Sequence, residues 1–201
     1  MISLLTPLPL LDDALTTAKN RLYEKLEREC SILIFLNPNE QLLDQLEAID
    51  HEKFREELWI THEELEEKTR QKGFIAFMIY SDGQPIAFLY GYQEPEDPYG
   101  FFLDEVATRI EGRGIGGILI VLSLIYCVEV GYDHIILYTE KSDDKGRRLE
   151  EFYGHMGFYL LNRDHQLGSI MRYDIDKERL VPLYNRVMFK EGGPFPPYLT
   201  K

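Results

Sequence analysis

Cysteine is scarce in this sequence of 201 residues: only Cys30 and Cys127 occur, far apart and in no metal-binding or redox spacing. A disulfide framework and a zinc site are therefore not indicated, and two free thiols fit a reducing cytoplasm. Long apolar runs are also lacking. The longest uncharged run, Gly114 to Val128, has 15 residues. A membrane-spanning helix needs roughly 20, so this run predicts a buried core helix instead.

Basic residues are few: 22 Lys and Arg stand against 35 Asp and Glu, which gives a net charge of −13. Nucleic acids and anionic membranes are bound through Lys and Arg, so neither is expected as a partner. The N-terminus lacks the basic stretch of a signal peptide, and Asp12 and Asp13 follow its two prolines. We expect a cytoplasmic protein, a monomer or homodimer, with a small, neutral or cationic partner.

Hydrophobic spacing divides the chain into a helical N-terminal extension (1–30), one domain (31–175) and an extended C-terminal tail (176–201). Strands are predicted at 31–36, 74–80, 85–92, 100–108, 134–138, 158–161 and 168–173, and helices at 11–30, 39–57, 61–72, 112–130 and 144–156. The turn at 81–84 favours an antiparallel hairpin. The fold class is α/β (α+β), with a mixed, largely antiparallel sheet of about seven strands flanked by helices.

A glycine cluster, Gly112-Arg113-Gly114-Ile115-Gly116-Gly117, lies between a predicted strand and the apolar helix. Glycines let a ligand approach the backbone, and a helix N-terminus offers free N–H groups, which suits a phosphate or pyrophosphate. One interpretation is a dinucleotide fold, because the cluster is a G-x-G-x-x-G and Glu140 lies near the place of a ribose-binding acid. Against it, a hairpin and a third strand precede the cluster, and only 84 residues follow it.

The cluster also resembles the pyrophosphate-binding segment of the GCN5-related N-acetyltransferases (GNAT), in which a strand is followed by R-G-x-G-x-G and a helix. Downstream, the segment from Phe152 to Phe158 (FYGHMGF) is similar to the family's second signature, and the element order over about 31–175 also matches. The resemblance implies the GNAT fold, acetyl-coenzyme A as cosubstrate, no metal, and acetyl transfer to a primary amine. The coenzyme-binding residues that it implies are Val106, Ala107, Thr108, Gly112, Arg113, Gly114, Ile115, Gly116, Gly117 and Arg147.

Three side chains receive catalytic roles from the same resemblance. Tyr153 aligns with the tyrosine that protonates the departing thiolate. Leu103-Asp104-Glu105 resembles the Leu-Glu-Asp on the same strand of polyamine-type members, in which the first acid assists deprotonation of the amine through water. Asp104 is preferred as the base, and strand alternation predicts that it shares its face with Phe102 and Val106.

Three positions depart from the family pattern: Glu111 replaces Arg or Gln, Gly146 replaces Asn, and Leu149 replaces a small residue. They leave open a degenerate acyl-coenzyme A-binding module that regulates without catalysing. The first 100 residues hold 20 acids and nine bases, and the other 101 hold 15 and 13. Because the acidic half would border the acceptor, the charge distribution favours a cationic small-molecule or peptide amine.

Overall fold

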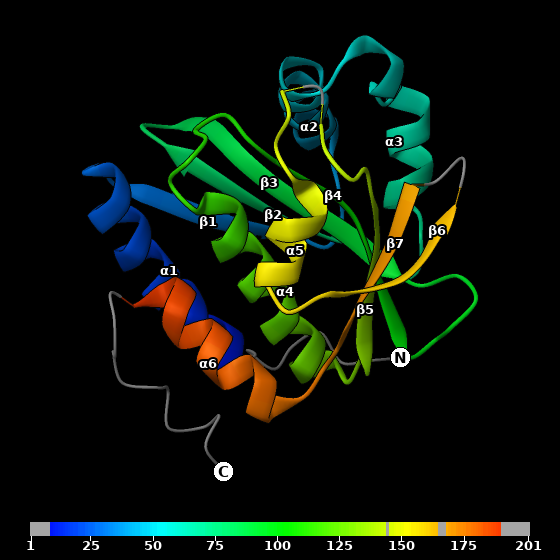
Figure 1. The fold of residues 1–201 in the computed structure, drawn as a ribbon. Coiled ribbons are helices and arrows are strands. Elements are labelled where there is room, and N and C mark those ends of the chain that lie inside the picture. The colour runs from blue at the N-terminus through cyan, green and yellow to red at the C-terminus, as the bar shows by residue number, and fades with distance from the viewer. Residues whose placement is uncertain (1–8, 144, 165–167, 190–201) are drawn as a thin grey trace.

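The structure, a computed structural model, describes residues 9–143, 145–164 and 168–189 (Figure 1). Its elements in chain order are α1 (Pro9–Leu26), β1 (Cys30–Phe35), α2 (Glu40–Lys53), the 3₁₀ helix η1 (Glu56–Leu58), α3 (His62–Thr69), β2 (Ile75–Ser81), β3 (Gln84–Gln93), β4 (Gly100–Thr108), α4 (Ile115–Val130), β5 (His134–Thr139), α5 (Leu149–His155), β6 (Tyr159–Asp164), β7 (Gly168–Asp174) and α6 (Lys177–Met188). None of these helices has the length and apolar character that crossing a membrane requires.

The strands form one seven-stranded sheet in the order β1-β2-β3-β4-β5-β7-β6. Within the described residues β4 and β5 make a parallel pair, and the other neighbouring strands are antiparallel. The mixed, largely antiparallel sheet predicted from the sequence is thus confirmed. A dinucleotide fold is wrong for this chain, because such a fold is built on a mostly parallel sheet.

Helices cover both faces of the sheet, with α1, α4, α5 and α6 on one side and α2 and α3 on the other (Figure 1). Along β2, Ile75, Phe77 and Ile79 face the first layer, while Ala76 and Met78 face the second. This alternation follows from the pleat of a strand that is buried on both faces. The apolar run predicted as a core helix is α4, which is buried from Ile115 to Cys127 except for half-buried Gly116.

The N-terminal helix α1 is part of the main core. Ala14, Ala18 and Leu22 are fully buried and belong to the same apolar cluster as α4. The backbone N–H of Leu11 donates a hydrogen bond of 2.7 Å to Oε1 of Glu129 in α4. Although 1–30 was predicted as an extension, its helix contributes to the packing of the domain.

An extended tail from residue 176 is wrong for residues 177–188, which form α6. The side chain of Asp176 caps this helix by accepting from the N–H of Glu178. Leu180, Leu183 and Tyr184 follow helical spacing and are buried, so tertiary packing outweighs the cost of Pro182 inside the helix. The proline-rich end of the predicted tail, 190–201, lies outside the described residues.

Candidate active site

A cavity of about 1080 Å³ opens where β4 and β5 separate. The two strands pair at residues 100–102 of β4 and 134–136 of β5 and then diverge. Beyond this point the C-terminal half of β4, Asp104–Thr108, lines the cavity together with the end of β5, the glycine loop, the α2–α3 segment and α5. Backbone groups of β4 that would pair with β5 in a continuous sheet are thereby available to a ligand.

Nearly all the predicted site residues meet in this cavity. The lining includes the predicted catalytic residues Asp104, Glu105 and Tyr153. It also includes these predicted coenzyme-binding residues: Val106, Ala107, Thr108, Gly112, Gly114, Ile115, Gly116, Gly117 and Arg147. Arg113 is exposed on the loop and is not part of the lining.

The glycine loop presents free backbone donors to the cavity. Gly112 and Gly114 have φ angles of +72° and +71°, the left-handed region that favours glycine. Gly114 is the N-cap of α4, a 16-residue helix, and no side chain caps its first turn. The N–H groups at the start of α4 and the positive end of its dipole therefore favour an anion here.

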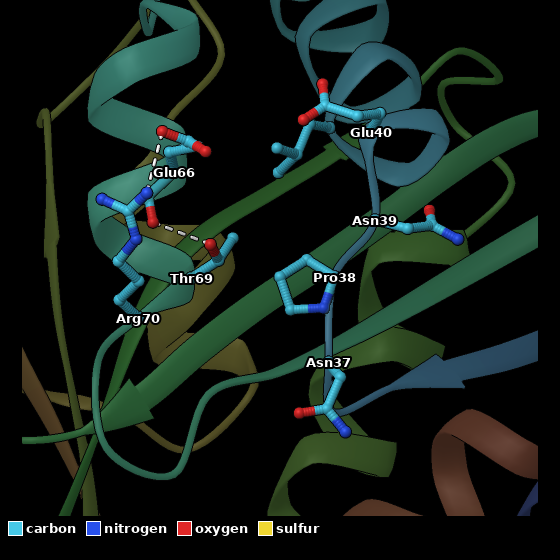
Figure 2. A pocket seen from close by; sticks show the side chains of 8 residues that line it. Asn37, Pro38, Asn39, Glu40, Glu66, Thr69 and Arg70 are labelled. Atoms are coloured by element: carbon cyan, nitrogen blue, oxygen red, sulfur yellow. Dashed lines mark hydrogen bonds and ion pairs between the residues drawn. The ribbon is translucent and has the colours of Figure 1, made fainter.

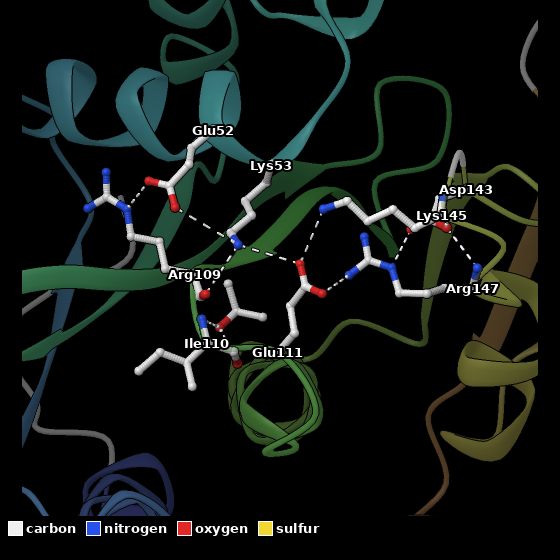
Figure 3. Close-up of polar contacts among 9 residues, drawn as sticks. Glu52, Lys53, Arg109, Ile110, Glu111, Asp143, Lys145 and Arg147 are labelled. Atoms are coloured by element: carbon white, nitrogen blue, oxygen red, sulfur yellow. Dashed lines mark hydrogen bonds and ion pairs between the residues drawn. The ribbon is translucent and has the colours of Figure 1, made fainter.

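Three basic side chains surround Glu111 beside the glycine loop (Figure 3). Arg147 Nη1 lies 3.0 Å from Oε2 of Glu111, and the Nζ atoms of Lys53 and Lys145 lie 3.5 and 3.6 Å from its Oε1. Burial would raise the pKa of Glu111, but the three cations together hold it below its ordinary value. Arg147 is also paired with Asp143. The rim of the cavity thus gathers cations from α2 and from the β5–α5 loop.

A β-bulge fixes the faces of the two acids on β4. Tyr90 of β3 lies opposite Glu105 and Gly91 lies opposite Leu103, so Asp104 is the additional residue. Both acids consequently face α2 and α3. Asp104 shares its face of the sheet with Phe102, as predicted. The prediction that it also shares this face with Val106 is wrong, because the bulge reverses the alternation after Asp104 and Val106 packs against the opposite cluster.

Each of the two acids on β4 has its own partners. Asp104 forms an ion pair with Lys68 of α3, with Nζ 2.8 Å from Oδ1 and 2.7 Å from Oδ2. Glu105 accepts a hydrogen bond of 2.8 Å at Oε2 from the hydroxyl of buried Tyr90. Burial raises the pKa of Glu105 well above its ordinary value, and the negative charge of Asp50 adds to this effect.

Asp50 and Lys68 were not identified as site residues from the sequence. Asp50 lies on the buried face of α2 with Leu42, Leu43, Leu46 and Ile49, and it is 2% exposed. An acid at a core position of an amphipathic helix is a signal that the sequence already contains.

Tyr153 reaches the cavity from α5 on the opposite side. Its ring packs edge-on against Phe152 and Phe158, with centroids 5.2 and 5.7 Å apart. Burial raises the pKa of Tyr153 far above its ordinary value, and the charge of Glu105 adds to the effect. The hydroxyl therefore remains protonated near neutral pH.

An apolar lip borders the acidic end of the cavity. Trp59 stacks on His51, with ring centroids 4.4 Å apart, and its Nε1 donates to the carbonyl of Phe54 at 3.0 Å. Both Trp59 and the neighbouring Leu58 line the cavity and are partly exposed. A ligand bound at this end would meet acids in the interior and apolar surface at the rim.

A second, smaller pocket of about 280 Å³ lies between the start of α2 and the end of α3 (Figure 2). In it Arg70 Nη2 is paired with Glu66 at 3.0 Å, and the Thr69 hydroxyl donates to the Glu66 carbonyl at 2.8 Å. None of the predicted site residues lines this pocket.

One group of possible metal ligands lies at the far end of β4 and β5 from the cavity. His134 Nε2 is 3.0 Å from Glu94 Oε2 and 3.9 Å from Asp97 Oδ2. The three ligand atoms are close enough to share a cation, but His134 and Glu94 are already hydrogen-bonded to each other. Because His134 is about 40 residues from Glu94 and Asp97 in the chain, the spacing of the sequence gives no sign of this group.

Comparison with known proteins agrees with this geometry. The family model described as the Acetyltransferase (GNAT) family matches residues 35–158. No curated protein sequence matches the chain.

Several solved structures have a similar fold. One is the PaiA N-acetyltransferase from Thermoplasma acidophilum in complex with coenzyme A, at 18% identity and a TM-score of 0.58, covering 72% of this chain and 99% of that one. Another is aminoglycoside 6′-N-acetyltransferase complexed with coenzyme A, at 18% identity and a TM-score of 0.61, covering 72% of this chain and 97% of that one. A third is the ribosomal-protein-S18-alanine N-acetyltransferase from Escherichia coli, at 13% identity and a TM-score of 0.57, covering 72% of this chain and 94% of that one.

Proposed function

The chain belongs to the acetyltransferase (GNAT) family, and from this premise we propose that it transfers the acetyl group of acetyl-coenzyme A directly to a primary amine. The acceptor in this proposal is a small molecule or a peptide. The observation that carries the proposal is that one cavity joins the glycine loop to two acids and a buried tyrosine. Direct transfer needs both substrates side by side, and a cavity of this size accommodates both reacting ends.

The glycine end of the cavity fits the coenzyme. The uncapped start of α4 suits the pyrophosphate, and Lys145 and Arg147 supply charge for a further phosphate. Two of the similar structures, the PaiA and the aminoglycoside enzymes, hold coenzyme A. The backbone N–H groups of Val106 and Thr108, at the separated part of β4, point away from β3 and would polarise the thioester carbonyl.

The remaining chemistry is a pair of proton transfers. The acceptor nitrogen forms its bond to the acetyl carbon while the carbon–sulfur bond breaks, so the nitrogen loses a proton and the sulfur gains one. We assign proton acceptance to Glu105 rather than Asp104, because Asp104 is held in an ion pair with Lys68. The protonated hydroxyl of Tyr153 would donate to the sulfur.

The acceptor end favours a cationic amine. Glu57, Glu64 and Glu67 line the cavity there in addition to the buried acids, and negative potential concentrates a cation before it loses its proton. The apolar lip formed by Leu58 and Trp59 suits an acceptor with a hydrocarbon part. A cytoplasmic location is part of this proposal, since both cysteines are free thiols.

Calorimetry with coenzyme A and acetyl-coenzyme A tests the coenzyme end. Gly116→Asp places a carboxylate in the cavity without backbone strain, since its Cβ would meet only Phe152 Cζ at 3.7 Å. We expect this variant to weaken binding at least tenfold. The matched control is Gly154→Asp, because a Cβ at Gly154 meets nothing within 4 Å. Failure of the wild type to bind either ligand would overturn the proposal.

Acetyl transfer is tested by release of free thiol with a panel of primary amines that includes mono- and polycations. Acetylation of an amine supports the proposal. Binding of acetyl-coenzyme A with no acetylation of any amine would instead support the regulatory module suggested by Glu111, Gly146 and Leu149.

A further inference from the structure

We infer that Asp50 of α2 and Glu105 of β4 form a single carboxyl pair that holds one shared proton near neutral pH. In this pair Asp50 is a positioning residue, which sets the pH at which Glu105 becomes available as a base. The kinetic part of this inference rests on the proposed function. The protonation state of the pair is a property of the folded chain alone.

The position of Glu105 is fixed by the sheet. The bulge at Asp104 turns its side chain toward α2, and the Tyr90 hydroxyl donates to Oε2 at 2.8 Å. Its other carboxylate oxygen, Oε1, is buried and has no N–H or O–H donor among the described residues. A buried oxygen in this state needs a proton or a donor nearby.

The position of Asp50 is fixed by the helix and the segment that follows it. Its Oδ2 accepts a hydrogen bond of 3.1 Å from the backbone N–H of Ile60, and its side chain is almost wholly buried. The side chains of Asp50 and Glu105 line the same cavity, and each carboxyl group acts on the pKa of the other. Two ionised carboxylates have no donor between them, so a direct contact between these groups requires a proton on one of the two.

Burial acts on both carboxyl groups in the same direction. It raises the pKa of Glu105, to which the charge of Asp50 adds, and it also raises the pKa of Asp50 against the hydrogen bond from Ile60. Two carboxylates in one buried site cannot both ionise easily, so their protons are lost in two separate steps that belong to the pair.

The charged and titratable groups that face the pair come from five elements. They are His51 on α2, Lys68 on α3, Tyr90 on β3, Asp104 on β4 and Tyr153 on α5. His51 Nε2 is 3.9 Å from Asp50 Oδ2, and it also lies 3.3 Å from the carbonyl of Ile60. The charge of Lys68 is largely compensated by Asp104 in their direct ion pair. Among the described residues, no cation in these surroundings is free to compensate two negative charges, so we infer that the pair keeps one proton and carries a single negative charge.

The chemical consequence is a base that is masked at low pH. When the second proton leaves to solvent, Glu105 becomes a carboxylate beside the acceptor. That carboxylate accepts a proton from the acceptor nitrogen as the new nitrogen–carbon bond forms, and it returns the proton to solvent after the product leaves. Acetyl transfer should rise with pH as the pair loses its second proton.

Infrared spectroscopy of the coenzyme-free protein tests the shared proton. At pH 7 the wild type should show the carbonyl band of a protonated carboxyl group, shifted in heavy water. Asp50→Asn keeps an oxygen for the N–H of Ile60, so it should fold, and both it and Glu105→Gln should lose the band. Glu129→Gln alters another half-buried carboxyl, outside the cavity, and should retain it. A wild type without the band, or a band that persists in both pair variants, would overturn the inference.

The pH dependence of kcat/KM tests the role of Asp50. Asp50→Asn removes a like charge from Glu105, so the rise in rate should move to lower pH by at least one unit. One unit corresponds to about tenfold more ionised base below the midpoint. Glu129→Gln should leave the profile in place. Superimposable profiles of Asp50→Asn and the wild type would reject the role, whereas an inactive wild type that shows the infrared band would reject the proposed function alone.

Discussion

Arg147 Nη1 lies 3.0 Å from Oε2 of Glu111, at the edge of the glycine loop where the proposed coenzyme phosphates would bind. Lys53 and Lys145 approach the same carboxylate (Figure 3). Glu111 is thus paired with three cations that would otherwise be free to bind an incoming phosphate, and its own negative charge repels such an anion. Glu111, one of the three residues that depart from the family pattern, is also the residue around which the local positive charge gathers.

Glu111→Gln is therefore expected to strengthen coenzyme A binding about fivefold at low salt. Removal of one charge at close range in water is worth roughly 1 kcal/mol, and added salt should shrink the gain. Calorimetry at two ionic strengths measures both effects. Glu151→Gln, which removes an equal charge from the exposed partner of Arg148, is the control. Unchanged or weaker binding by Glu111→Gln would contradict the expectation.

Lys68→Met is expected to move the rise of kcat/KM to higher pH. Without Lys68 the charge of Asp104 is uncompensated beside Glu105, and a like charge makes Glu105 harder to ionise. The double variant Lys68→Met/Asp104→Asn should shift the profile back toward that of the wild type. A single variant with an unchanged profile, or a double variant shifted further upward, would argue against this coupling.

The parts of the site that are contiguous in sequence could be predicted. The glycine loop and the Tyr153 segment each carry their own local pattern, and the structure places both in one cavity. The succession of strands along the chain could be predicted from hydrophobic spacing and from the hairpin turn at 81–84, because these signals are local as well.

The parts that depend on tertiary packing could not be predicted from spacing. Asp50 joins the site only because α2 packs over β4, and the bulge at Asp104 depends on the pairing of β3 with β4. Gly91, which lies opposite the bulge, is a local signal in the sequence. In the structure a Cβ at this position would overlap the carbonyl oxygen of Phe102. A lone glycine in the middle of a strand is typical of a bulge or a close backbone contact.

Tyr153→Phe is expected to lower kcat at saturating substrates by about a hundredfold, the usual contribution of a positioned acid. Coenzyme A binding and thermal stability should change little, because the ring and its contacts with Phe152 and Phe158 remain. Tyr138→Phe changes another tyrosine of the cavity lining, one that is 41% exposed, and serves as the control. An unchanged kcat for Tyr153→Phe would remove it from the proposed chemistry.

Leu22→Ala is expected to reduce the free energy of unfolding by about 2–5 kcal/mol, the usual cost of such a cavity in a core. Leu22 is fully buried between α1 and the rest of the domain, although α1 precedes the matched residues 35–158. Leu161→Ala on β6, where the side chain is 48% exposed, should change stability by less than about 0.5 kcal/mol. Urea unfolding that shows equal losses would mean that residues 1–30 are a loosely attached extension.

The carboxyl pair also predicts how stability depends on pH. The pKa of Glu105 is raised in the folded protein, so its contribution to stability is fully present below its ordinary pKa of 4.5 and declines as pH rises through the folded value. Glu105→Gln cannot ionise and lacks this decline. The stability of Glu105→Gln relative to the wild type should therefore increase with pH, by up to about 1.4 kcal/mol per unit for one proton. Urea unfolding between pH 5 and 8 measures this difference, with the exposed Glu151→Gln as control. A difference that stays constant over this range would mean that Glu105 ionises at its ordinary pKa, which its burial and the nearby charge of Asp50 should prevent.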